Sequence, residues 1–307
     1  MSIATIESLL AEREAKLVGA LSRLESVVVA YSGGVDSSLL AYYARKTLGA
    51  KARIVIAVSP SLAADELDEA RLQAEQFDWQ LLEVKTEEVD NPDYRKNDGQ
   101  RCYFCKGALF EAMDALAKHE GIANLAYGAN IADLGDIRPG QRAAAEYDVI
   151  SPLQEAELTK DEIRELAKRA GLSSWDKPQS ACLSSRFPTF ETVTPERLKI
   201  VEKAEMALRK LGIKGFRVRF HSLNTNGQTG SEELSLARLE LDVLDLQKVS
   251  TNETLRSQLV SAVKGAGFSF VTLDLEGYRQ GSSNVGAKTS ASAADAEFVP
   301  VELTRRG

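Results

Sequence analysis

The sequence predicts an α/β protein built on a parallel sheet, followed by a smaller α+β domain. Over residues 1–187, short runs rich in β-branched residues alternate with segments whose apolar residues recur at helical spacing. A glycine-containing loop directly follows the first of these runs. Beyond it the pattern changes to strands in which apolar and polar residues alternate. We therefore expect domains at 1–187 and 188–280, and a flexible Ser/Ala/Gly-rich tail at 281–307.

Buried strands are predicted where short apolar runs are bounded by turn residues. They fall at 26–30, 53–58, 80–84 and 123–127. Helices are predicted at 3–24, from the glycine loop through Tyr43, and at 65–77, 107–118 and 159–170. Strands that alternate with helices imply right-handed crossovers and a mostly parallel sheet. Thr159 and Glu162 stand at the positions of a capping box for the last of these helices.

The second domain is predicted from a different pattern. Helices are expected at 195–211 and 252–264, and strands at 215–221, 234–241 and 268–275. The first two strands alternate with a period of two, which is typical of a sheet with one face on a core.

Composition excludes several classes of protein. The chain has 307 residues, of which 44% are hydrophobic and 27% charged, as in ordinary globular proteins. No apolar run approaches the ~20 residues needed to span a bilayer, and the N-terminus lacks the pattern of a signal peptide. The net charge of −7 makes a broad nucleic-acid surface improbable. We expect a cytoplasmic protein with no membrane or nucleic-acid partner.

The loop after the first strand is the expected ligand site, because ligands bind beyond the carboxyl ends of parallel strands. The candidate phosphate-binding residues are Ser32, Gly33, Gly34, Asp36, Ser37 and Ser38. The glycines allow a close approach of an anion, and the following helix directs free N–H groups at it. Shaping of a turn is the simpler alternative. Asp36 argues against it, because a carboxylate in an anion site makes sense when Mg²⁺ lies between it and phosphate.

Three cysteines, Cys102, Cys105 and Cys182, are the second candidate site. Three thiolates could hold three irons of a 4Fe–4S cluster and leave the fourth iron open. A structural zinc would need His119 or His221 as a fourth ligand. The other readings are a redox pair, a catalytic thiol at Cys182, or three buried small hydrophobes. We favour the cluster.

Ser-Gly-Gly-Val-Asp-Ser at 32–37 resembles the PP-loop of ATP pyrophosphatases, which cleave ATP to AMP and pyrophosphate and so activate a carbonyl. Further strings, at 128–130, 136–140, 184–188, 217–221 and 271–275, resemble LarE-type sulfur transferases in the same order. This family builds the nickel-pincer nucleotide cofactor of lactate racemase. The match spans nearly the whole chain.

The resemblance implies that a carboxylate of pyridinium-3,5-dicarboxylate mononucleotide is adenylylated and then converted to a thiocarboxylate, with ATP and Mg²⁺ required. One branch of the family sacrifices its own cysteine, which stands one position earlier, at Ala181 here, and that branch lacks the C-x-x-C. The resemblance therefore favours the branch with a 4Fe–4S cluster. It also implies a homo-oligomer, a hexamer in the family's best-described member, and makes a sulfide donor protein a possible partner.

Two arginines, Arg217 and Arg219, are expected on one face of a strand, where their guanidinium groups suit the mononucleotide phosphate. A solvated face with paired carboxylates is the alternative. Weaker anion-binding candidates are Lys106, Arg138, Ser185 and Arg186, with Gly128 at the nucleotide. Weaker metal candidates are Glu205 and Glu240, by default surface residues, and Asp133 and Asp136, which could also bind ribose.

Three other functions remain open on the sequence. A PP-loop tRNA thiolase would use similar cysteines but needs a basic surface, and an ammonia-using synthetase would not need them. A non-catalytic iron–sulfur or nucleotide-sensing protein would bind ATP without turnover. Release of pyrophosphate separates the last class from the enzymes.

Overall fold

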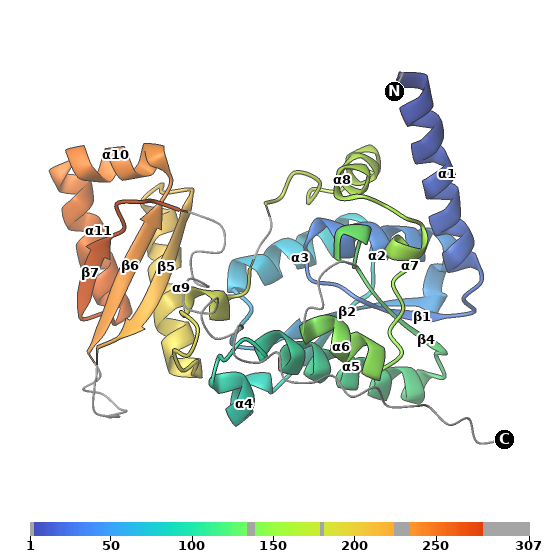
Figure 1. The fold of residues 1–307 in the computed structure, drawn as a ribbon, viewed down its shortest axis with the longest axis horizontal. Coiled ribbons are helices and arrows are strands. Elements are labelled where there is room, and N and C mark those ends of the chain that lie inside the picture. Colours follow the sequence, from blue (N-terminus) through green and yellow to red (C-terminus); the bar gives the residue numbers. More distant parts are fainter. Residues whose placement is uncertain (1–2, 134–138, 179–180, 224–233, 279–307) are drawn as a thin grey trace, which may run out of the picture.

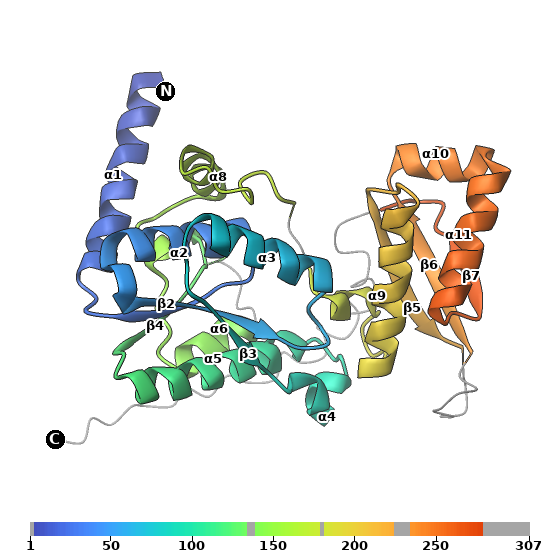
Figure 2. The ribbon, with the colours of Figure 1, turned by 180° about the vertical axis from the view of Figure 1, so that it is seen from behind.

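Two sheets organise the chain in the computed structural model, which describes residues 3–133, 139–178, 181–223 and 234–278. The larger sheet has the order β3-β2-β1-β4 and the smaller one β5-β6-β7. Figures 1 and 2 show the two sheets at opposite ends of the molecule, each with its own helices. None of the described helices is long and apolar enough to cross a membrane.

The larger sheet is parallel throughout and lies between two layers of helices. Its strands are β1 (Val27–Ala30), β2 (Ala52–Val58), β3 (Leu81–Lys85) and β4 (Asn124–Tyr127). On one face pack α1 (Ile3–Ser22), α2 (Val35–Leu48), α3 (Ala64–Gln76) and α8 (Lys160–Arg169). On the other face pack α5 (Arg101–Glu120) and α6 (Pro139–Glu146). Because successive side chains of a strand point to opposite faces, Val27 and Val29 enter one core and Val28 the other.

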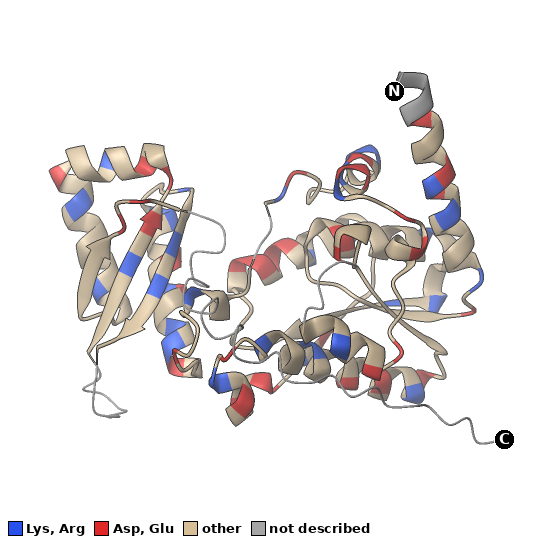
Figure 3. Ribbon diagram, in the orientation of Figure 1, with Lys and Arg blue, Asp and Glu red and all other residues tan. Residues whose placement is uncertain are grey.

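The smaller sheet has helices on one face. Strand β5 (Phe216–Ser222) runs antiparallel to β6 (Ser235–Leu241), and β6 runs parallel to β7 (Phe270–Leu273). Helices α9 (Pro195–Lys210) and α11 (Glu253–Ala266) pack on it, and α10 (Val243–Thr251) follows β6. Basic residues mark β5 and β6 in Figure 3.

Short helical turns connect these elements. They are η1 (Gly49–Lys51), η2 (Glu88–Asp90), α4 (Pro92–Arg95), η3 (Ile131–Asp133), α7 (Pro152–Glu155) and η4 (Leu183–Arg186). Three residues from before position 188, Tyr94, Leu183 and Phe187, belong to the core of the smaller sheet. Where one domain ends and the next begins therefore stays a prediction.

The predicted fold class is confirmed, and so are the strands, within two residues at each end. One helix was misplaced: α5 begins at Arg101 rather than at 107, so the C-x-x-C lies inside the helix and not before it. Nothing between 101 and 106 breaks a helix, and the apolar aromatic residues there obscured its start. Helices α6 and α10 were not predicted. The tail at 281–307 lies outside the described residues.

Candidate functional site

The loop from Tyr31 to Ser38 folds tightly on itself at the end of β1. Gly33 has φ +73°, a left-handed conformation that favours glycine, and Gly34 is the N-cap of α2. The backbone N–H of Ser32 donates to Ser37 Oγ at 3.1 Å, and Ser37 Oγ donates to the Gly34 carbonyl at 3.0 Å. The free N–H groups at the start of α2 are left for an anion.

Ser38 stabilises this loop from its buried side. Its side chain is fully buried, donates to the Gly34 carbonyl at 2.9 Å and accepts from Gln73 Nε2 at 2.8 Å. The prediction that Ser38 presents its hydroxyl to phosphate is therefore not supported by its position. Ser32, Gly34 and Asp36 do line a cavity.

Gly128, at the end of β4, touches the same loop. A Cβ atom there would lie 2.7 Å from the backbone nitrogen of Ser37 and 2.9 Å from the carbonyl carbon of Asp36. Only glycine lets β4 approach α2 this closely. Gly128 therefore lies beside the loop that is predicted to bind the nucleotide, and a larger residue would not fit there.

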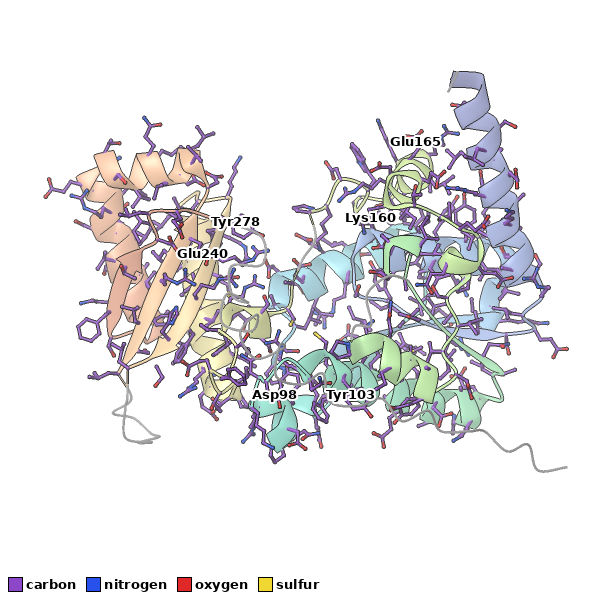
Figure 4. The ribbon with its side chains drawn as sticks, viewed as in Figure 1. Asp98, Tyr103, Lys160, Glu165, Glu240 and Tyr278 are labelled. Carbon is purple, nitrogen blue, oxygen red and sulfur yellow. The ribbon has the colours of Figure 1, made fainter. Side chains whose placement is uncertain are left out.

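Asp36 is held by two side chains. Asn130 Nδ2 donates to Asp36 Oδ1 at 3.3 Å, and Lys160 forms an ion pair with Asp36 Oδ2. Lys160 is the first residue of α8, directly after the N-cap Thr159, and it appears at that helix start in Figure 4. Sequence reasoning found the capping box but missed Lys160, because only the fold brings the start of α8 to the loop.

Asp36 and Lys160 border two cavities. One, of about 370 Å³, extends from the loop to Cys182. Its basic lining residues are Lys160, Arg164, Lys177, Arg186 and Arg209, against Asp36 and Glu66 as the acidic ones. The other, of about 390 Å³, contains Lys106, Tyr127, Gly128 and Asp133. Four of these cations are ion-paired with carboxylates, and among the described residues Arg164 donates only to backbone carbonyls, so it is the cation best placed to attract a polyphosphate or carboxylate ligand.

Cys102 and Cys105 lie in α5, and Cys182 directly precedes η4, which Arg101 of α5 contacts through the Ser184 carbonyl. Cys182 lines the first cavity, and Cys182 and Cys102 are exposed. Burial raises the pKa of the Cys105 thiol well above its ordinary value, and the nearby Cys182, Glu88 and Cys102 raise it further. Even so, within the described ranges no three His, Cys, Asp or Glu side chains are gathered closely enough to hold a metal ion.

Three contacts tie the Cys182 loop to the rest of the site. Leu183 N donates to the Ser61 carbonyl at 2.9 Å, and Arg101 Nη1 donates to the Ser184 carbonyl at 2.8 Å. The hydroxyls of Tyr94 and Ser184 are 2.6 Å apart. Arg101 precedes Cys102 in α5, so it fixes the C-x-x-C helix against the Cys182 loop. Neither Arg101 nor Tyr94 was predicted, since their roles depend on contacts 83 and 90 residues away along the chain.

Two buried ion pairs stand beside this loop. Arg186 Nε and Nη2 donate to the two oxygens of Glu205, each at 2.9 Å. Arg219 Nη2 donates to Glu240 at 2.8 Å, and its Nη1 to the Ser185 carbonyl at 2.7 Å. Both glutamates are fully buried, so the default expectation of surface glutamates was wrong. Both carboxylates are bound to guanidinium groups, which leaves little support for them as metal ligands.

Arg217 differs from Arg219. It has no carboxylate partner among the residues that the structure describes; its Nη1 donates to the Phe216 carbonyl at 2.9 Å and its guanidinium lies 5.1 Å from the Tyr278 ring centroid. Burial lowers the pKa of Arg217, and the neighbouring Arg186 lowers it further. A half-buried cation among other cations would favour a bound anion, and the assignment of Arg217 to an anion site stays a prediction.

The remaining candidates divide by position. Lys106 Nζ lies 4.7 Å from the Tyr127 ring centroid in the second cavity, and Asp133 Oδ2 accepts from the backbone of Asn130 at 3.0 Å. Ser185 Oγ accepts from Arg186 at 3.2 Å. Asp136 and Arg138 lie outside the described residues.

Several known proteins are similar to this chain in sequence. The NAD synthase family matches residues 13–103. An uncharacterised protein of Synechocystis is 42% identical over 85% of this chain and 92% of its own length. Pyridinium-3,5-bisthiocarboxylic acid mononucleotide synthase of Lactiplantibacillus plantarum is 34% identical over 90% of this chain and 95% of its own length. The chain belongs to the LarE-type family.

As a LarE-type protein, the chain is an ATP-dependent sulfurtransferase with a PP-loop. ATP and Mg²⁺ fit the loop, since Asp36 supplies the hard oxygen ligand that Mg²⁺ prefers. An uncharacterised protein of Methanocaldococcus jannaschii is also similar, 28% identical over 83% of this chain and 91% of its own length.

Proposed function

We propose that this enzyme adenylylates the carboxylates of pyridinium-3,5-dicarboxylate mononucleotide and converts them to thiocarboxylates, as a step in making the nickel-pincer cofactor of lactate racemase. The observation that carries the proposal is the cavity of about 370 Å³ that contains both Asp36 of the PP-loop and Cys182. The name of the Lactiplantibacillus relative states a bisthiocarboxylic product, which two rounds of this reaction would give.

In the first step, a carboxylate oxygen of the substrate attacks the α-phosphorus of ATP, and pyrophosphate leaves with the electron pair of the broken P–O bond. The N–H groups at the start of α2 would hold the leaving pyrophosphate. Asp36 would hold Mg²⁺, which offsets the negative charge there. Lys160, which is paired with Asp36, would offset further negative charge on the same phosphates.

In the second step, a sulfur nucleophile attacks the carbonyl carbon of the acyl adenylate, and AMP leaves. Cys182 is the sulfur that borders the cavity. Arg186 Nη1 donates to the Cys182 carbonyl at 2.9 Å and so keeps this loop at the cavity wall. Arg217 is the residue that we assign to the phosphate of the mononucleotide.

Two routes for sulfur remain as proposals. In the first, Cys102, Cys105 and Cys182 hold a 4Fe–4S cluster whose open iron carries sulfide. Within the described ranges the thiols do not form a metal-binding group, so the cluster supplies none of the contacts assigned to the two steps. In the second route the Cys182 thiolate displaces AMP and forms a thioester with the substrate; a base then removes the Cα proton, the Cβ–S bond breaks, and the sulfur leaves as the thiocarboxylate while dehydroalanine remains at 182.

The test of the overall reaction measures pyrophosphate release and the exchange of carboxylate oxygen for sulfur by mass spectrometry. Asp36→Asn should lose both signals, whereas Cys182→Ala should keep pyrophosphate release and lose the thiocarboxylate. ATP binding without turnover would overturn the proposal in favour of a nucleotide sensor. Turnover that requires tRNA instead of the mononucleotide would favour the thiolase.

Iron analysis decides between the two sulfur routes. Protein expressed anaerobically should contain about four iron and four acid-labile sulfide per chain if a cluster is held, and Cys102→Ala should lose them. A folded, active protein without iron would exclude the cluster. It would then predict the loss of one H₂S from Cys182 after a single turnover.

We also propose the division into domains at 1–187 and 188–280 and a homo-oligomeric assembly. Limited proteolysis tests the first and light scattering the second. A sulfide donor protein is a possible partner on the cluster route, since that route needs a fresh sulfide for each turnover.

A further inference from the structure

Gln73 lies on the side of α3 that faces the PP-loop. Helix α3 packs beside α2 on one face of the larger sheet (Figure 2), and a Cβ atom on Gly33 would lie 3.6 Å from that of Ala70. Gln73 follows Ala70 by three residues on the same helix, and its side chain is 3% exposed. It lines neither of the two cavities at Asp36, so the reaction as described does not use it.

All four hydrogen-bonding positions of the Gln73 amide are used. Nε2 donates to the Tyr31 hydroxyl at 2.9 Å and to Ser38 Oγ at 2.8 Å. Oε1 accepts from Ser173 Oγ at 3.0 Å and from the Ser174 backbone N–H at 3.2 Å. A backbone N–H can only donate, so Ser174 fixes which end of the amide is the oxygen. The NH₂ end therefore faces the PP-loop.

This amide decides where the single proton of the Ser38 hydroxyl points. A hydroxyl donates through one proton and accepts through its lone pairs. Because Gln73 Nε2 can only donate, Ser38 Oγ must accept from it, and the proton of Ser38 goes to the Gly34 carbonyl at 2.9 Å. A side chain at position 73 that could only accept would draw this proton away from Gly34.

The Gly34 carbonyl is held by three donors at the start of α2. They are Ser37 Oγ at 3.0 Å, Ser38 Oγ at 2.9 Å and the Ser38 backbone N–H at 2.9 Å. In a planar trans peptide the carbonyl and the next N–H point in opposite directions. A carbonyl held toward the helix therefore turns the Val35 N–H outward, to the end of α2 where an anion binds. Val35 lines the cavity at that end.

We propose that Gln73 is a positioning residue for the loss of pyrophosphate. Through Ser38 it holds the peptide between Gly34 and Val35, so that the Val35 N–H meets the leaving group. This inference rests on the proposed role of the loop in holding pyrophosphate. A donor that is already oriented needs no reorganisation as charge develops on the leaving oxygen, so Gln73 acts mainly on the transition state.

The experiment compares Gln73→Glu with the wild type in a steady-state assay of pyrophosphate release from ATP in the presence of the mononucleotide. Glutamate keeps the shape and the oxygen that accepts from Ser173 and Ser174, but it turns a second acceptor toward Ser38. We expect kcat to fall about tenfold or more and KM for ATP to change by less than about threefold. Gln76→Glu, the same change at an exposed position of α3, is the matched control and should leave both constants unchanged.

Ser38→Ala completes a double-mutant cycle with Gln73→Glu. If Gln73 acts through Ser38, each single variant should lower kcat by a similar factor, and the double variant should lose no more than about twofold beyond either. Independent structural effects would instead multiply, to about 10²-fold. Gln73→Met, which is uncharged and of similar volume, replaces Gln73→Glu if circular dichroism shows that the buried carboxylate unfolds the chain.

Three results would overturn the assignment of Gln73: a wild-type kcat in the folded variant, a raised KM for ATP with kcat unchanged, or effects that multiply in the double variant. A wild-type protein that released no pyrophosphate would refute the proposed function and this inference with it. Normal release by the wild type together with normal release by the Gln73 variant refutes this inference alone, so the two failures are distinguishable.

Discussion

Replacing Glu205 by glutamine tests whether the buried pair with Arg186 holds the Cys182 loop. The side chains are 6% and 1% exposed for Arg186 and Glu205, and two hydrogen bonds of 2.9 Å join them. Burial acts to lower the pKa of Arg186, but the charge and hydrogen bonds of Glu205 raise it overall, so the guanidinium stays charged. Glutamine has nearly the same shape as glutamate. It would leave the positive charge of Arg186 buried without a counter-charge and would turn its N–H₂ group toward the guanidinium, which is itself a donor.

Removal of one partner from a buried pair costs about 3–5 kcal/mol, because the other charge is left without compensation. At about 2–4 °C per kcal/mol for a chain of this order of size, the melting temperature should fall by roughly 10 °C. Urea unfolding followed by circular dichroism measures the free energy directly. Glu75→Gln, at an exposed position on α3, should stay within about 0.5 kcal/mol of the wild type. A loss below about 1 kcal/mol for Glu205→Gln would refute the reasoning and reopen Glu205 as a metal ligand.

Three further predictions concern the site. Gly128→Ala must displace the PP-loop by about 0.7 Å, because the new Cβ would lie 2.7 Å from Ser37 N and ordinary contact begins at 3.4 Å. The rate of pyrophosphate release should therefore fall about 10²-fold, and an unchanged rate would contradict the packing argument. Lys160→Met removes the cation beside Asp36 and should lower kcat for pyrophosphate release about 10²-fold in a coupled assay, whereas a wild-type kcat would count against its role. Burial, followed by nearby arginines, lowers the pKa of His221, so the unfolded chain takes up this proton first as the pH falls. Stability should therefore decline below about pH 6.5, by at most 1.4 kcal/mol per pH unit, and urea midpoints from pH 5 to 8 should show this slope reduced in His221→Gln.

Local signals predicted the fold well. Strand β1 is a run of valines buried on both faces, and the glycines of the PP-loop follow it at once, so periodicity and turn chemistry agree there. The capping box of α8 is present in full, because Thr159 and Glu162 satisfy each other across only three residues. Signals that act over a few residues are readable without the fold.

The site was only partly predictable, because its key contacts join distant segments. Arg217 and Arg219 look equivalent in sequence, yet Arg219 is paired with Glu240 on the neighbouring strand while Arg217 has no carboxylate partner among the described residues. In the strand register Glu240 stands opposite Arg217 and Arg238 opposite Arg219, so the pairing of Arg219 with Glu240 runs diagonally across the strands and depends on how the side chains pack. Lys160 likewise could not be assigned to Asp36 before α8 was placed beside the loop.

The capping box of α8 has a practical consequence for anyone handling this protein. Glu162 caps the helix that begins with Lys160, and it is also ion-paired with Arg13 of α1. A short series of contacts thus links the N-terminal helix, through the first turn of α8, to the carboxylate of Asp36. Affinity tags, fusions or truncations at the N-terminus are usually chosen for convenience. A truncation that removes Arg13 would break the ion pair with Glu162, which caps the helix turn that carries Lys160, the partner of Asp36.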